Sequence, residues 1–172
     1  MRMFNNIIVA LKTPIPLCDR VLEIVALAML LIQLVLTAVV YHMAPAEVPY
    51  KFNRLIEPIE WIDKEIYWYI AILFVVLILI TSASAYEIRL INLPVRLKEP
   101  VLVSQKRLIF RMSRCITLCV ELIWLSYLLI SSITFFNLPK VVLYVMSYSS
   151  FTLLIGVIIY FSVKVWWIGR KY

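Results

Sequence analysis

The sequence predicts an all-α membrane protein with four transmembrane helices. Its 172 residues are 64% hydrophobic, whereas soluble domains average about 45–50% apolar residues. Four apolar runs are each close to the roughly 20 residues that cross a bilayer as a helix. A third observation, the uneven placement of lysine and arginine, indicates the orientation. Residues 21–172 are therefore expected to form one domain, with helices at about 21–41, 66–86, 115–136 and 141–163.

Residues 1–20 precede the first apolar run and are expected to form a cytoplasmic lead. The stretch FNNIIVALK suits a short helix at the membrane surface, and the two prolines after it would end that helix because proline cannot continue a helix interior. Asp19 is the expected N-cap of the first spanning helix. That helix carries Glu23 near its inner end and Gln33 near mid-membrane.

Basic residues are concentrated in three of the five segments outside the apolar runs. Thirteen lie in residues 1–20, in the 87–114 connection and after the last apolar run, against four in the other two connections. Because positively charged loops stay in the cytoplasm, both termini and the basic inner loop 87–114 are expected inside, and the 42–65 loop outside. This rule accounts for the net charge of +7, so nucleic-acid binding is not expected.

The second half of the inner loop, from Val101, is expected to be helical and to run into the third spanning helix. Arg107, Arg111 and Arg114 then share one helix face. Such a stripe holds anionic lipid headgroups at about 1 kcal/mol per basic residue. The alternative is that these arginines serve topology alone, and the residues favour neither interpretation.

Polar residues inside the apolar runs gather in the predicted cytoplasmic half. Glu121, in the third helix, lies about 10 Å deeper than Arg114, where a carboxylate must face protein or water, be neutral, or pair with a cation. An arginine or lysine reaching in from the interface would satisfy both Glu23 and Glu121. The small residues 82–85 let another helix approach closely. The polar set is thus either a helix-packing surface or a proton or ligand site.

Catalytic motifs and cofactor-binding patterns are missing from the sequence. The single histidine, His42, is expected on the opposite side of the membrane from the three cysteines, so no metal site is predicted. GxSxG, HExxH and phosphate-binding glycine loops do not occur. We therefore expect a non-enzymatic protein without cofactors.

The 42–65 connection contrasts with the apolar runs on either side of it. Three prolines fix φ and favour extended neighbours, and Asn53 is a natural turn residue. Phe52 and Trp61 are apolar enough to lie back on the outer helix ends. The segment is expected to be a short, structured extracytoplasmic loop.

This loop resembles a segment of the SdpI-like membrane proteins, a family with a domain of unknown function and a role in immunity and signalling against a secreted bacterial killing peptide. The family pattern is roughly L-P-x-x-[IV]-P-x-H-F-N-x-x-G-x-x-D-x-[WY]-x-x-K, placed after the first transmembrane helix. The chain matches it at Pro45, Val48, Pro49, Phe52, Asn53, Trp61 and Lys64. Where the pattern has leucine, histidine, glycine and aspartate, the chain has Ala44, Lys51, Ile56 and Ile59.

The flanking stretches PLCDRVLEI and NLPVRLKEP are similar to short Bacteroidota-type members of the family, so the resemblance covers about residues 14–130. It implies a bacterial inner-membrane protein, with the lipid bilayer and an extracellular peptide or membrane protein as partners. The ligand-binding residues it implies are Pro45, Val48, Pro49, Lys51, Phe52, Asn53, Trp61 and Lys64. The alternative is an accessory subunit of a membrane complex, or a small transporter-like protein working through Glu23, Gln33 and Glu121.

Overall fold

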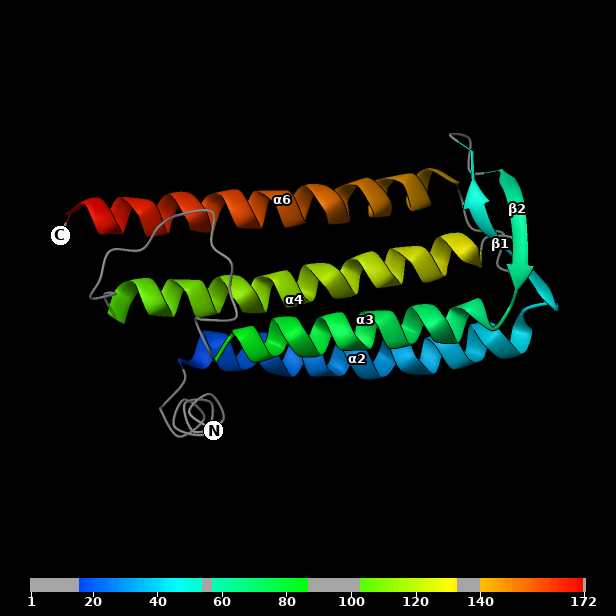
Figure 1. Ribbon diagram of the computed structural model, residues 1–172, viewed down its shortest axis with the longest axis horizontal. Coiled ribbons are helices and arrows are strands. Elements are labelled where there is room, and N and C mark those ends of the chain that lie inside the picture. The colour runs from blue at the N-terminus through cyan, green and yellow to red at the C-terminus, as the bar shows by residue number, and fades with distance from the viewer. Residues whose placement is uncertain (1–15, 54–56, 87–102, 133–139, 172) are drawn as a thin grey trace.

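The computed structural model describes residues 16–53, 57–86, 103–132 and 140–171. Its elements are α2 (Leu17–Met43), β1 (Glu47–Phe52), β2 (Pro58–Asp63), α3 (Ile66–Ser84), α4 (Val103–Ser131) and α6 (Lys140–Lys171). The helices run side by side along the long axis, and the two strands lie across one end of the bundle (Figure 1). We call this the hairpin end, and the opposite end, where α2 begins and α3 finishes, the basic end.

Four helices are long and apolar enough to cross a membrane, which confirms this part of the prediction. The candidate spans are Leu17–Met43, Ile66–Ser84, Gln105–Ser131 and Tyr144–Ile168. Even the shortest helix, α3 with 19 residues, reaches about 28 Å, close to the hydrocarbon thickness of about 30 Å. The described residues thus have the architecture of a multi-pass membrane protein.

Three of the helices, α2, α4 and α6, extend beyond the predicted spans at the basic end. α2 starts at Leu17, directly after Pro16, because a proline is tolerated at the start of a helix. α4 starts at Val103, so the last twelve residues of the predicted inner loop 87–114 are helical. α6 continues to Lys171 because lysine and arginine are good helix formers outside the lipid as well.

Other predicted segments fall outside the described residues. These are most of the 1–20 lead with its surface helix, the first part of the inner loop, and residues 133–136 of the third predicted span. Within the described residues α4 ends at Ser131 and α3 ends at Ser84, two residues before the predicted end of its span.

α4 is the central helix of the bundle. α2, α3 and α6 all pack on it, and α6 lies on the other side of α4 from α2 and α3 (Figure 1). Accordingly, 44% of the apolar part of α4 is buried, against 11% for α6. The core at this centre includes Trp124, which is fully buried and stacks on Phe74 with ring centroids 5.7 Å apart.

Small polar residues hold α3 against α4, as predicted for residues 82–85. The hydroxyls of Ser84 and Ser113 are hydrogen-bonded to each other, and the Ser113 hydroxyl is 2.6 Å from the Thr81 carbonyl oxygen. Thr117 Oγ1 lies 3.0 Å from Thr81 Oγ1. Such side chains let two backbones approach closely and then link them.

The predicted outer loop folds as an antiparallel β-hairpin. Glu47 lies opposite Asp63, and the register shifts on both sides of Lys51. Val48 is only 1% exposed and joins the core at the ends of the helices. An ordered loop with extended residues was expected here, but the pairing of two strands was not. In a two-stranded sheet every strand is an edge strand, so Pro49 is accommodated.

Candidate functional site

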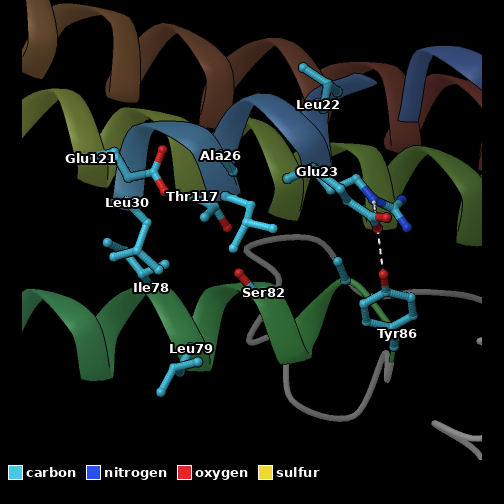
Figure 2. A pocket seen from close by; sticks show the side chains of 13 residues that line it. Leu22, Glu23, Ala26, Leu30, Ile78, Leu79, Ser82, Tyr86, Thr117 and Glu121 are labelled. Carbon is cyan, nitrogen blue, oxygen red and sulfur yellow. Dashed lines mark hydrogen bonds and ion pairs between the residues drawn. The ribbon is translucent and has the colours of Figure 1, made fainter. Parts of the chain in front are cut away.

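A cavity of about 250 Å³ lies between α2, α3 and α4, in the half of the bundle nearer the basic end (Figure 2). Its volume falls between the about 150 Å³ that holds a benzene molecule and the lower limit of about 300 Å³ for drug-sized pockets. Most of the lining is apolar, from Leu22, Ala26, Leu27, Leu30, Ile78, Leu79 and Ala85. The polar lining residues are Glu23, Ser82, Tyr86, Arg114, Thr117 and Glu121.

Helical spacing brings these residues to one place. On α4, Arg114, Thr117 and Glu121 are three and then four residues apart and share a face. The facing positions Ala26 and Ser82 have short side chains, which leave the space open. α2 and α3 touch each other less than either touches α4, so the gap between them is not closed by packing.

Glu121 occupies one end of the cavity. Its side chain is fully buried, and neither carboxylate oxygen has a hydrogen-bond partner among the described residues. The carboxyl group lies near Leu30 and Thr117 (Figure 2). Gln33 does reach Glu121, but its Nε2 donates to the backbone carbonyl at 2.8 Å and not to the carboxylate.

The opposite end of the cavity is lined by residues of a charged cluster. Arg114 Nε donates to Glu23 Oε1 at 2.8 Å, and the Tyr86 hydroxyl donates to the same oxygen at 2.5 Å. Arg111 Nε donates to Asp19 Oδ1 at 2.7 Å, and Arg114 lies 3.8 Å from the other oxygen of Asp19. Two arginines therefore neutralise two acids at the basic end.

This cluster confirms one sequence prediction, for Glu23, and contradicts two, for Glu121 and Asp19. Among the described residues, the expected arginine partner exists for Glu23 but not for Glu121, because Arg114 is bonded to Glu23 and lies about two turns away. Asp19 is not the N-cap: it is buried in the first turn of α2, and no side-chain cap bond forms there. Its carboxylate turns to Arg111 instead.

The predicted arginine stripe is divided between two environments. Arg111 and Arg114 do share a face of α4, but that face meets the acids of α2. Arg107 is exposed, together with Lys106. Two of the three arginines therefore form ion pairs with acids of α2, and binding of lipid headgroups by the stripe stays a prediction.

Most of the predicted outer-loop site residues build the hairpin. Val48 and Pro49 are buried, and Lys51 Nζ is bonded to Glu60 Oε1 at 2.7 Å. Asn53 Nδ2 donates to Glu57 Oε2 at 2.8 Å, and Asn53 Oδ1 accepts from the Glu57 N–H at 2.9 Å. These contacts favour a structural role for the residues that make them.

The remaining loop residues lie at the edges of the hairpin. Lys64 Nζ is 4.7 Å from the centroid of the Tyr41 ring, where a cation–π contact ties β2 to α2. Phe52 is half-buried, while Pro45 and Trp61 are exposed. Trp61, at 51% exposure, is the predicted loop residue with the largest free apolar surface.

The hairpin should loosen in acid. Hydrogen bonds from Lys51 and then Tyr50 lower the pKa of Glu60 below its ordinary value. A group whose pKa is lowered in the folded protein stabilises the fold at pH values above its ordinary pKa, which is about 4.3 for glutamate. This stabilisation is lost as the pH falls through the pKa of the folded state. We therefore expect the hydrogen-exchange protection of the Lys64 amide, which is bonded to Ala46 O, to fall below about pH 4.

The matched control for this prediction is Glu60→Gln, which keeps a hydrogen-bond acceptor but removes the titrating group. Its Lys64 protection should be lower near neutral pH and should not change across the same acid range. Exposed ion pairs contribute little, so the effect should be small. An acid profile that is the same in both proteins would show that another group controls the hairpin.

The cavity as a unit was not predicted from the sequence, although Glu23, Glu121 and the small residues 82–85 were. Ala26 and Tyr86 were missed. Ala26 lies on the same helix face as Glu23, and this spacing opposite the small residues of α3 was the available signal. Within the described residues, no group of three histidine, cysteine or acidic side chains lies close enough together to hold a metal ion.

Comparison of the chain with protein-family models, with curated proteins and with solved structures finds no match. The geometry of the cavity and of the hairpin is therefore the basis of the proposed function.

Proposed function

We propose that this chain is a non-enzymatic membrane protein that binds a lipid-soluble molecule in the cavity between α2, α3 and α4. The observation that carries the proposal is Glu121, a residue that lines the cavity and whose fully buried carboxyl group has no partner among the described residues. Placing an ionisable group in the hydrocarbon region costs free energy, and such a group typically marks a substrate or ion site. Binding, with or without transport, is therefore favoured over a packing role.

The ligand enters from the bilayer in this proposal. Leu27 and Leu79 line the cavity and are also 59% exposed on the outer surface of the bundle. The opening between α2 and α3 thus faces the region that lipid would occupy. The other end is lined by Glu23, Arg114 and Tyr86, so a ligand entering from the aqueous side would meet the charged cluster.

We also propose a bacterial inner membrane with both termini in the cytoplasm. The distribution of thirteen basic residues against four supports this orientation, and the resemblance to SdpI-like proteins supports the membrane. In this orientation the cavity lies in the cytoplasmic half of the bilayer, and the hairpin caps the outer end.

A second candidate function is recognition of an extracellular peptide by the hairpin. The resemblance to the SdpI-like loop supports it, as do four exposed apolar side chains of the hairpin, Tyr50, Ile59, Trp61 and Ile62. Because most of the other matched residues are engaged within the hairpin, this surface is narrower than the resemblance implies. We rank it below the cavity, which offers a partly enclosed space and a polar group without a partner among the described residues.

The proposed function predicts that a single-ring hydrophobic photoprobe accumulates in the cavity. The full chain in lipid nanodiscs is labelled with 3-trifluoromethyl-3-phenyldiazirine, and labelled peptides are mapped by mass spectrometry. Labelling near Leu30 and Ile78 should exceed the labelling of the lipid-facing surface of α6. Ala26→Phe should reduce this excess at least about fivefold, because the phenyl ring fills space of about the probe's own size.

The matched control is Ala28→Phe, which adds the same ring on the same helix at an exposed position. It should leave the excess labelling unchanged. Uniform labelling of all apolar surfaces, or an equal loss in both variants, would contradict cavity binding. Trp61→Ser should have no effect on this labelling.

A further inference from the structure

We infer that the ligand of the cavity is a small lipid-soluble primary amine whose ammonium group pairs with Glu121. This inference rests on the proposed function and names the chemical class of its ligand. It follows from the charge balance around the cavity, the hydrogen-bond donors of its lining, and its size.

Around the cavity, three acidic side chains face two arginines, so one acid has no counter-charge among the described residues. At the basic end, Asp19 and Glu23 are paired with Arg111 and Arg114, through contacts of 2.7 Å and 2.8 Å. Glu121 has no such partner among the described residues. Burying a carboxylate without a counter-charge costs free energy. A ligand that places a positive charge at this end of the cavity therefore gains the most binding free energy.

No donor of the lining is hydrogen-bonded to this carboxyl group in the contacts that the described residues make. Thr117 Oγ1 is bonded to Ser113 O at 3.1 Å and lies 3.0 Å from Thr81 Oγ1. Tyr86 and Arg114 donate to Glu23, and Gln33 donates to a backbone carbonyl. The ligand must therefore bring the donors.

Two acceptor oxygens favour an amine over an alcohol. A primary ammonium group carries three N–H donors, whereas a hydroxyl group carries one. Hydrogen bonds to a charged group contribute more than neutral ones, at about 1.5–3 kcal/mol against about 1 kcal/mol each. An amine therefore satisfies both oxygens of Glu121, and an alcohol of the same size satisfies at most one.

The rest of the ligand should be apolar and small. Between Glu121 and the charged cluster the cavity is lined mainly by leucine, isoleucine and alanine. A volume of about 250 Å³ accommodates one aromatic ring with a short alkyl arm. A second cationic group would lie near Arg114, about 10 Å along α4, so a monoamine fits better than a diamine.

The test uses 4-phenylbutylamine and 4-phenyl-1-butanol, which share ring and chain and differ in the terminal group. Each competes with 3-trifluoromethyl-3-phenyldiazirine for labelling of the cavity peptides, with the α6 peptides as the reference for partition into lipid. On the unmodified chain the amine should compete at a concentration at least about tenfold lower than the alcohol. Glu121→Gln, which keeps the shape of the side chain, should abolish this difference.

The outcomes separate this inference from the proposed function. Equal competition by amine and alcohol on the unmodified chain overturns the amine assignment, whatever the variant does. A preference for the amine that persists in Glu121→Gln overturns the role of Glu121. If neither compound reduces cavity labelling, and Ala26→Phe has no effect either, the proposed function itself fails.

Discussion

Arg114→Leu is expected to lower the free energy of unfolding by about 2–4 kcal/mol, one of the two largest effects that the structure predicts. Arg114 is 7% exposed and contacts both Asp19 and Glu23. Removing one partner of a buried ion pair costs about 3–5 kcal/mol because the other charge is left uncompensated. The expected loss for Arg114→Leu is smaller because Glu23 is 31% exposed, so water partly solvates its charge. SDS-driven unfolding, followed by tryptophan fluorescence, measures the change.

Arg107→Leu is the matched control. It removes the same charge from the same helix, but Arg107 is exposed, so the change should stay within about 0.5 kcal/mol. Adding Glu23→Gln to Arg114→Leu should recover part of the loss, since the uncompensated acid is then removed. Equal destabilisation by the two arginine variants would mean that net charge, and not the cluster, controls stability.

Trp124→Ala should destabilise the bundle by about 3–5 kcal/mol. The side chain is fully buried on the central helix α4 and is stacked on Phe74 of α3 with an interplanar angle of 4°. Truncation of a buried tryptophan removes these contacts and leaves a cavity that the neighbouring helices fill only in part. The same SDS titration measures the loss, with fluorescence from the other tryptophans as the signal.

Trp124→Phe distinguishes packing from hydrogen bonding. It keeps a ring against Phe74 and removes an indole N–H that has no partner among the described residues. A buried donor without a partner is unfavourable, so its removal offsets part of the stability that is lost with the smaller side-chain volume. The loss should be less than half of that for Trp124→Ala. A loss as large as for alanine would indicate that the indole N–H is bonded in the folded protein.

Some features of the site follow from residue type and spacing. Glu23 was expected to find an arginine from the interface, and Arg114 supplies it. The small residues of α3 were expected to admit a neighbouring helix, and α4 packs there through Ser113 and Thr117. In both cases the residues on one face of a helix and their depth were enough to state what the partner had to provide.

Other features depend on how the helices are rotated about their own axes. Glu121 also lies in the predicted cytoplasmic half, but Arg114 turns toward α2 and leaves Glu121 without a partner among the described residues. Arg111 belongs to a basic stripe that is typical of a lipid-facing surface, and the rotation of α4 directs it to Asp19. The hairpin was not predicted because extended residues alone do not show which strands pair, and the pairing of β1 with β2 is a tertiary contact that tolerates proline at a sheet edge.

The sequence by itself determined that four helices of this chain suit a bilayer, where they begin to within a few residues, apart from the early start of α4, and which acids lie within them. These properties follow from apolar length and local helix propensity, which are summed along each segment. Only the tertiary structure decided which acid is neutralised, which arginine is exposed and where the cavity lies. Those outcomes depend on contacts between α2, α3 and α4, and a rotation of one helix by a single residue position would change every one of them.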